Sequence, residues 1–279
     1  MVKERDFHFT DQDFKRIQGL VSEHTGINLS DAKKDMVYSR LSRRLRALDI
    51  DKFQDYCNLL EDEHEDELIQ FTNAITTNLT SFFREPHHFE YLAQKVLPAL
   101  AQKNAHSKKI RIWSAGCSTG EEPYTIAMTL LENMSGFRGW DIKILATDLD
   151  SNVVATASNG IYTQERVNGI SKPRLNKWFR KGSGDNADKV RVADDLKNLI
   201  TFKKLNLMHE WPMKGPFDII FCRNVVIYFD KPTQRQLFDR YHSLMAPDGH
   251  LFIGHSESLY RVSDKFSLIG NTIYQRKAD

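Results

Sequence analysis

The sequence predicts an α/β protein in which a doubly wound, mostly parallel sheet follows a helical N-terminal domain. Two patterns indicate this fold class. From Lys109 onward, short apolar segments alternate with amphipathic ones, as strands and helices do in a parallel sheet. Before residue 76, the apolar residues recur at helical spacing instead. The expected strands cover Ile110–Ser114, Ile142–Thr147, Phe217–Cys222 and Leu251–Gly254, with a helix from Glu121 to about residue 134.

The first 75 residues have the pattern of amphipathic helices. Thr10 suits the N-cap of the first helix, because Asp13 stands at its third position and Phe9 and Phe14 can form a hydrophobic staple. A second helix is expected after Ser30 and another at the end of the domain, with a stretch rich in acidic residues between them. Their apolar faces carry Val37, Leu41, Leu45 and Leu48, and then Leu68, Phe71 and Ile75.

Changes in pattern define the expected domains. Residues 1–75 form the helical domain, and residues 109–279 form the sheet domain. Between them, residues 76–108 begin with the polar and aromatic segment TTNLTSFFREPHHF, which has no clean periodicity and indicates a linker that contributes to the functional site. Residues from about 162 to 204 break the alternation of the sheet domain. They carry the turn KGSGDNAD and the short β-like runs Lys189–Val192 and Leu199–Phe202, which predicts a small insertion.

Composition excludes several classes of protein. Hydrophobic residues make up 41% and charged residues 27% of the 279 residues, as is ordinary for a globular protein. No apolar run approaches the roughly 18 residues of a membrane span, and the first ten residues do not resemble a secretory signal. The three cysteines form no CxxC pair. We therefore expect a cytoplasmic protein without disulfides or membrane insertion.

A glycine-containing loop, Gly116–Gly120, follows the first expected strand. Ligands of doubly wound sheets bind at this edge, and Gly116 would let the backbone approach one closely. The loop lacks the Lys-Ser/Thr pair of a P-loop. Glu121 and Glu122 follow it and favour a ligand with positive charge over a pyrophosphate. The alternative is a capping box between Thr119 and Glu122, which would stabilise any helix start.

Two further strands also end in polar residues. Asp148 follows the second strand, where an acidic residue commonly binds ribose hydroxyls. The alternative is a helix N-cap, since Asp148 and Asp150 both precede an expected helix. Arg223 follows the apolar run FDIIFC, so its charge must be paired or emerge into a cleft. Tyr228 lies nearby, either at this site or in the core.

Other chemistries find less support in the sequence. Zinc needs clustered ligands, and the adjacent His87 and His88 are not expected to share one helix face. The segment GHSES resembles a nucleophile elbow, but no histidine follows His255 to complete a triad. The sheet domain carries no stripe of basic and aromatic residues that would indicate RNA. The glutamate pair disfavours a nucleotide-dependent oxidoreductase. A partner-binding protein that merely retains a ligand site stays open.

Five segments, taken together and in this order, resemble the chemotaxis receptor methyltransferases (CheR): TTNLTSFFRE, WSAGCSTGEEPY, ATDLD, FDIIFCRNVVIYFD and APDGHLFIGHSES. The resemblance covers nearly the whole chain. It implies a class I S-adenosylmethionine methyltransferase fold, with a helical N-terminal domain and an antiparallel β subdomain at the insertion. It also implies an enzyme that converts S-adenosylmethionine to S-adenosylhomocysteine while it esterifies glutamates on the cytoplasmic helices of chemoreceptors, for adaptation in bacterial chemotaxis. We expect no metal and no nucleic-acid partner.

The resemblance also assigns roles to residues. It places Arg84 and Tyr228 near the transferred methyl group. It implies cofactor contacts for Asn78, Thr80, Arg84, Gly116, Glu122, Asp148, Asn206, Leu207, Arg223 and Asn224. Family members that dock a receptor's C-terminal pentapeptide have three glycines in the turn of the β subdomain. Here Gly182 and Gly184 are present but Asp188 takes the third position, which argues against such tethering. The resemblance does not name a regulatory protein partner.

The second expected helix carries three arginines away from its apolar face. Arg40, Arg43 and Arg46 recur at every third position, and a strongly acidic stretch follows at once. A solvated face is the plain interpretation. Because the implied substrate is a helical bundle that bears glutamates, we expect these arginines to dock the receptor instead.

Overall fold

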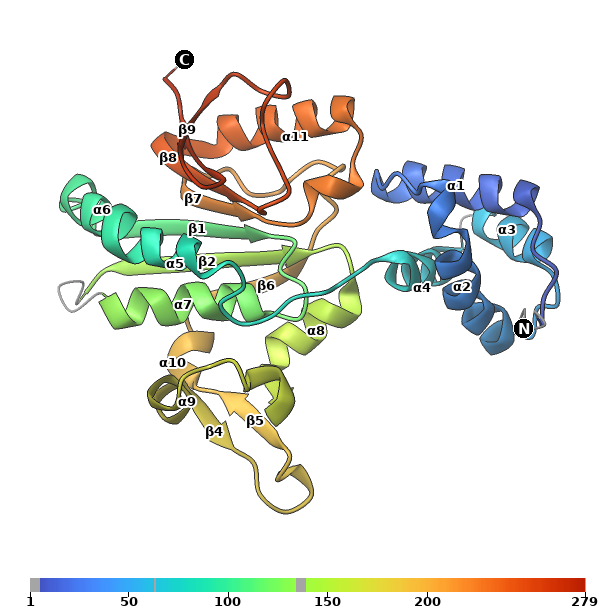
Figure 1. The fold of residues 1–279 in the computed structure, drawn as a ribbon, viewed down its shortest axis with the longest axis horizontal. Helices are drawn as coiled ribbons and strands as arrows, with labels where there is room; N and C mark the ends of the chain where they lie inside the picture. Colours follow the sequence, from blue (N-terminus) through green and yellow to red (C-terminus); the bar gives the residue numbers. More distant parts are fainter. Residues whose placement is uncertain (1–5, 63, 134–138, 279) are drawn as a thin grey trace.

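The computed structural model describes residues 6–62, 64–133 and 139–278, and it places a helical domain beside a sheet domain (Figure 1). The helical domain holds α1 (Asp11–Thr25), α2 (Lys34–Leu48), α3 (Phe53–Glu61) and α4 (Glu65–Ile75). The capping box at Thr10 is confirmed, because its hydroxyl accepts from the Asp13 amide at 3.0 Å and Asp13 accepts from the Thr10 amide at 2.9 Å. The rings of Phe9 and Phe14 meet edge to face, as the staple requires.

Helix α3 was not foreseen within the acidic stretch. Its buried side chains are Phe53, Tyr56, Cys57 and Leu60, and their spacing follows one face of a helix. The many charges around them conceal this stripe in the sequence. Glu67 is itself buried, where it accepts hydrogen bonds from Arg44 and from Tyr56 at 2.7 Å. The expectation for Leu48 was wrong: this last residue of α2 is 36% exposed, beyond the reach of the domain core.

The large sheet has seven strands in the order β6-β2-β1-β7-β8-β10-β9. The first five run parallel, and β10 pairs antiparallel with both of its neighbours. The mostly parallel, doubly wound sheet is therefore confirmed. The strands are β1 (Lys109–Ala115), β2 (Asp141–Asp148), β6 (Ile200–Lys204), β7 (Phe217–Cys222), β8 (Met245–Ile253), β9 (Phe266–Gly270) and β10 (Ile273–Arg276).

Alternate residues of the central strands enter two separate cores, one on each face of the sheet. Ile112 and Ile219 join one core, whereas Trp113 and Ile220 join the other. Residue 134, the expected end of the helix that starts at Glu121, lies outside the described residues. The helices that flank the sheet are α5 (Pro86–Tyr91), α6 (Leu97–Lys103), α7 (Glu121–Asn133), α8 (Ser151–Asn159) and α11 (Lys231–Leu244). No helix among the described residues is both long and apolar enough to cross a membrane.

The insertion projects from one end of the sheet domain (Figure 1). Its three antiparallel strands pair in the order β3-β5-β4. The expected end of the insertion at about residue 204 needs correction, because β6 pairs with β2 as an edge strand of the large sheet. A β-like run shows that a strand forms but not which sheet receives it. The elements of the insertion are β3 (Ile161–Thr163), α9 (Lys172–Trp178), β4 (Phe179–Lys181), β5 (Lys189–Val192) and α10 (Asp194–Lys197).

The arginines of α2 do not form one free surface. Arg40 donates from one guanidinium nitrogen to the carbonyls of Ile75 and Thr76, both at 2.7 Å, and so caps the end of α4. Arg46 pairs with Asp6. Only Arg43 extends into solvent without a described partner. The expected docking face is therefore corrected, because Arg40 and Arg46 are engaged within the domain.

We predict that Arg40→Ala lowers the free energy of unfolding by about 1.5–3 kcal/mol, because the carbonyls at the end of α4 lose a charged donor. Denaturant unfolding measures this change. The exposed Arg43→Ala variant is the matched control and should unfold like the parent. Equal stability of the two variants would mean that the guanidinium of Arg40 does not hold α4.

Candidate functional site

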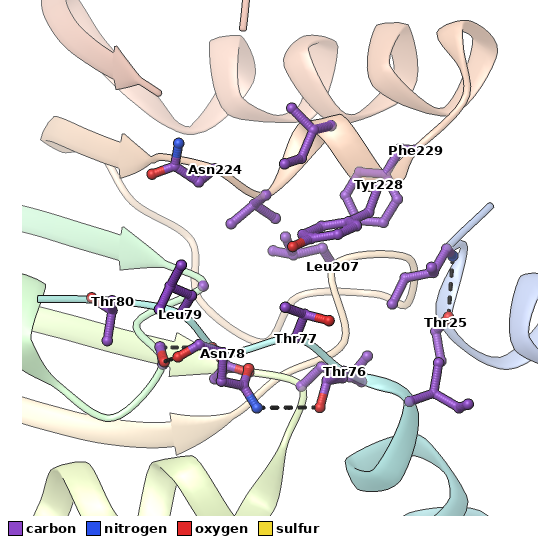
Figure 2. Close-up of a pocket in the computed structure, with 18 of the residues that line it drawn as sticks. Thr25, Thr76, Thr77, Asn78, Leu79, Thr80, Leu207, Asn224, Tyr228 and Phe229 are labelled. Atoms are coloured by element: carbon purple, nitrogen blue, oxygen red, sulfur yellow. Dashed lines mark hydrogen bonds between the residues drawn. The ribbon is translucent and has the colours of Figure 1, made fainter. Parts of the chain in front are cut away.

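A cavity of about 470 Å³ lies where the carboxyl ends of β1, β2 and β7 meet the helical domain and the linker. This volume is typical of sites for small molecules. In Figure 2 the linker residues Thr76–Thr80 run along one side of the cavity, and Leu207, Tyr228 and Phe229 lie opposite. The strand order places β1 between β2 and β7, so the loops after β1 and β7 diverge at the point where ligands of doubly wound sheets bind.

The loop after β1 forms the floor of the cavity. Gly116 has a φ of +87°, and a Cβ atom there would lie 2.4 Å from a methyl group of Val225. Any side chain at this position would therefore be strained and would displace the loop after β7. Glycine at position 116 keeps the two loops close together while the backbone stays open to the ligand.

Glu122 faces the cavity from the first turn of α7. One of its oxygens accepts from the Ser114 hydroxyl at 2.7 Å, and the other accepts from Arg223 at 3.0 Å. Burial raises the pKa of Glu122, and the charge of Arg223 opposes that rise. The alternative capping box is wrong, because the Thr119 hydroxyl donates to Glu121 instead.

The expectation that two glutamates face the ligand is corrected as well. Glu121 is fully buried, pairs with Arg166 and does not line the cavity. Neighbouring residues on a helix point about 100° apart, so only one of the two carboxylates can face the cavity. Glu122 alone supplies negative charge at the start of α7.

Asp148 lies at the end of β2 and lines the cavity. Its carboxylate accepts from the amides of Ser118 at 2.8 Å and of Asp150 at 3.0 Å. Burial raises the pKa of Asp148 to about 6, although these amides lower it. The N-cap of α8 is Asp150, whose side chain accepts from Asn152 at 2.8 Å. Asp148 is thus left to face the cavity.

Short polar contacts fasten the linker against the sheet domain. Asn78 donates to Asp150 at 2.8 Å, and its own carbonyl accepts from the Ser118 hydroxyl at 2.9 Å. Further along, Arg84 donates to the carbonyl of Leu79 at 2.9 Å. These contacts turn a segment without periodicity into a defined wall of the cavity.

The loop after β7 adds Asn224 and Tyr228 to the cavity. Asn224 has a φ of +59°, and its amide donates to Glu257 at 2.9 Å. Glu257 also accepts from the amides of Gly254 and Ile227, so one buried carboxylate shapes this loop. Glu257 was not singled out in the sequence, where nothing distinguishes it from a surface glutamate.

Residues of the helical domain join the site across the interface. The Asn28 amide donates to the carbonyl of Tyr228 at 2.8 Å, and Asn206 donates to the carbonyl of His24 at 2.7 Å. Asn206 thus uses its side-chain nitrogen to hold α1, which the sequence did not indicate. The lining residues missed from this domain include Thr25, Ile27, Asn28, Leu29, Lys33 and Met36.

Arg223 is the buried cation expected after β7, and its partners come from two elements. Besides Glu122 it contacts Glu85 at 3.3 Å and donates to the carbonyl of Arg84. His255 contacts the other oxygen of Glu85 at 2.7 Å. Burial raises the pKa of Glu85, but the contact with His255 and the charge of Arg223 outweigh it and lower that pKa to about 2.

His87 and His88 were not expected to share one helix face, yet within α5 their ring centroids lie only 4.2 Å apart. Burial and the nearby Arg223 lower the pKa of His88 to about 3, so its ring is neutral at pH 7.

The structure gathers every expected cofactor and catalytic position around one cavity. The lining includes Asn78, Thr80, Arg84, Gly116, Glu122, Asp148, Asn206, Leu207, Arg223, Asn224 and Tyr228. Arg40, Arg43 and Arg46 lie outside it. The roles of these residues in binding or catalysis stay predictions.

Comparison with known proteins agrees with this arrangement. Residues 12–76 match the family model of the CheR methyltransferase all-alpha domain, and residues 78–275 match that of the CheR methyltransferase SAM binding domain. Chemotaxis protein methyltransferase 2 of Pseudomonas aeruginosa is 44% identical over 97% of this chain and 95% of its own length. The chemotaxis protein methyltransferase of Escherichia coli is also 44% identical, over 97% of this chain and 92% of its own.

Among solved structures, an S-adenosylmethionine dependent methyltransferase from Mesorhizobium loti aligns at a TM-score of 0.31 and 17% identity. That alignment covers 56% of this chain and 51% of the other, and it adds nothing to the assignment. The two family models and the close relatives decide it. The chain belongs to the CheR family and is an S-adenosylmethionine-dependent methyltransferase of chemotaxis.

Proposed function

We propose that this enzyme esterifies glutamate side chains on the cytoplasmic helices of methyl-accepting chemotaxis receptors, and that it acts in the cytoplasm. The observation that carries the proposal is the combination, in one cavity, of the carboxylates of Glu122 and Asp148 at its base and an apolar rim at its mouth. The base suits a cationic cofactor and the rim suits a helix. The relatives are named chemotaxis protein methyltransferases, which fits a receptor as the substrate.

The residues of the cavity fit S-adenosylmethionine by charge and shape. Glu122 offers a buried carboxylate to the ammonium group, and the half-buried Asp148 offers a second carboxylate to the ribose hydroxyls. The Nε atom of Arg223 is buried without a described hydrogen-bond partner and suits the carboxylate of the methionine portion. Asn206 and Leu207 would flank the adenine. When bound, the cofactor supplies a methyl group activated by its sulfonium.

The proposed reaction does not require the protein to remove a proton from the substrate glutamate. A glutamate with an ordinary pKa near 4.3 is already ionised at neutral pH, so no general base is needed. The protein must strip water from the carboxylate and align it. We assign this role to Arg84 and Tyr228, which both line the cavity. Arg84 already donates to the carbonyl of Leu79, and this shared contact would keep it from holding the nucleophile too tightly.

The mouth of the cavity suits an amphipathic helix. Leu79 is 78% exposed and Ile227 is 49% exposed, and both lie among the lining residues beside Arg84 and Tyr228. Apolar residues of a receptor helix would cover these two side chains while a glutamate enters between them. Because Asp188 replaces the third glycine of the subdomain turn, we expect recognition through the methylated helices and not through a receptor tail.

Radiolabelled S-adenosylmethionine and receptor-containing membranes test the proposal. We expect label on the receptor that is released by mild base, as a carboxyl methyl ester requires. Base-stable label, or label on RNA in the same extract, would assign another substrate class. Cofactor binding without any transfer to receptor would indicate a partner-binding protein that retains the cofactor site.

We predict that Asp148→Ala weakens S-adenosylhomocysteine binding by about 1–3 kcal/mol, the cost of losing hydrogen bonds to a charged group. The raised pKa of Asp148 adds a pH dependence. The ionised carboxylate is the better acceptor, so protonation competes with binding below about pH 6, and affinity should fall roughly tenfold by pH 5. Calorimetry from pH 5 to 8 measures both effects. The Asp148→Asn variant is the matched control and should lose the pH dependence; a parent-like profile in that variant would exclude Asp148.

We also predict that Arg84→Ala and Tyr228→Phe each lower kcat by more than they weaken binding of S-adenosylhomocysteine. The reason is that both side chains are assigned to the carboxylate that receives the methyl group. Steady-state kinetics with receptor membranes measure kcat, and calorimetry measures the affinity for S-adenosylhomocysteine. Equal losses in turnover and in affinity would place these residues in the cofactor pocket instead.

The docking proposal now depends on Arg43. We predict that Arg43→Glu slows receptor methylation at low ionic strength and flattens its salt dependence, because steering by exposed charges is screened by salt. Affinity for S-adenosylhomocysteine should not change. Lys95→Glu reverses an exposed charge before α6, in the sheet domain, and serves as the matched control. If both variants follow the parent across the salt series, Arg43 belongs to a solvated face.

A further inference from the structure

Three metal-ligating side chains converge where the linker enters α5. One oxygen of Glu85 and one ring nitrogen each of His87 and His88 lie within 4.8 Å of one another. All three atoms, Glu85 Oε2, His87 Nε2 and His88 Nδ1, are buried, and no described residue hydrogen-bonds to any of them. None of the three residues lines the cofactor cavity. Buried polar atoms without a hydrogen bond are rare, and three in one cluster require an explanation, even though Arg223 forms an ion pair with Glu85 Oε2 at 3.3 Å.

The hydrogen bonds of His88 fix which of its ring nitrogens carries the proton. Its Nε2 atom lies 3.2 Å from the carbonyl oxygen of Asn271 and 3.0 Å from the hydroxyl of Thr272. A carbonyl can only accept, and the Thr272 hydroxyl spends its own proton on that carbonyl at 2.8 Å. Nε2 is therefore the donor. The buried Nδ1 atom is left without a described hydrogen-bond partner.

This nitrogen faces a carboxylate. His88 Nδ1 lies 3.5 Å from Glu85 Oε2. Arg223 approaches the same oxygen at 3.3 Å as its ion-pair partner. Two buried acceptors that face each other are unfavourable unless a proton donor or a cation lies between them. A water molecule can donate to two acceptors, whereas a metal ion satisfies all three atoms at once.

The geometry and the surroundings resemble those of a zinc site. Bonds of about 2.0–2.1 Å at tetrahedral angles place ligand atoms roughly 3.4 Å apart, close to the 3.5 Å between His88 and Glu85. The contact of His88 with a backbone carbonyl is the usual way to orient a metal-bound imidazole, and His255 similarly holds the second oxygen of Glu85. Arg223 contacts both Glu85 and Glu122. One guanidinium therefore faces two carboxylates, so it does not cancel the negative charge of this region.

We infer that Glu85, His87 and His88 form a binding site for one divalent transition-metal ion, with zinc as the preferred ion. Two imidazole nitrogens and one carboxylate oxygen favour zinc over magnesium or calcium, which prefer oxygen ligands. Three protein ligands leave a fourth position for water. The site adjoins the cofactor cavity through Arg223 but is built from other residues.

Calorimetric titration of the chelator-treated enzyme with zinc chloride tests this inference. We expect one zinc ion bound per chain and no binding of magnesium under the same conditions. His87→Gln removes one of three ligands from a half-exposed position and should weaken zinc binding at least tenfold. His106→Gln removes an exposed histidine elsewhere and should bind zinc like the parent. Unfolding midpoints of the metal-free variants verify that both are folded.

Crystals soaked in zinc chloride give an independent measurement. Anomalous scattering at the zinc edge should show one peak among Glu85, His87 and His88. Zinc affinity that is unchanged in His87→Gln, or lost in His106→Gln, would overturn the inference. So would a map in which a water molecule, without anomalous signal, bridges the three side chains.

Discussion

The buried guanidinium of Arg223 is the interaction on which the rest of this site depends. Its side chain is only 2% exposed, and it contacts Glu122 on α7, Glu85 at the end of the linker and the carbonyl of Arg84. A charge in this position cannot remain unpaired, because removing one partner of a buried ion pair leaves an uncompensated charge that costs several kcal/mol. Three segments that are distant in sequence are therefore held together by one side chain.

This constraint explains why the linker can serve as a wall of the cavity. Residues 76–85 have no periodic apolar face that could pack against the sheet. Their position depends on polar contacts at both ends of this segment: Arg40 caps α4 where the segment begins, and Arg223 pairs with Glu85 where it ends. Between these points Asn78 forms hydrogen bonds with Asp150 and Ser118. A wall built in this way presents backbone and small polar groups to the ligand and leaves Leu79 facing outward.

Much of the fold could be predicted because its signals are local. The capping box at Thr10 and the apolar strand β7 are contained within a few residues each. The exceptions depend on partners that are distant in sequence. Helix α3 was hidden because its buried stripe lies among charges, and β6 was assigned to the insertion because a short run does not reveal which strand it pairs with.

The candidate site shows the same difference between local signals, which could be predicted, and contacts between distant residues, which could not. Motif order identified the residues that gather around the cavity, but it did not show how each one is used. Asn206 uses its side-chain nitrogen to hold the carbonyl of His24, and Arg40 serves α4 instead of a partner. Glu257 shapes the loop after β7 through three amides, yet nothing in the sequence distinguishes it from other glutamates. Such roles arise from tertiary contacts, which spacing along the chain does not encode.

The acidic residues near the cavity show how position in the fold sets the pKa of a carboxylate. Glu85 meets Arg223 and His255, which lower its pKa to about 2, so it stays charged and structural. Asp148 meets only backbone amides, and burial raises its pKa to about 6. The protein thus compensates the charge of Asp148 only through backbone amides. If Asp148 binds the ribose hydroxyls as proposed, these hydrogen bonds would relieve part of the cost of burying its charge.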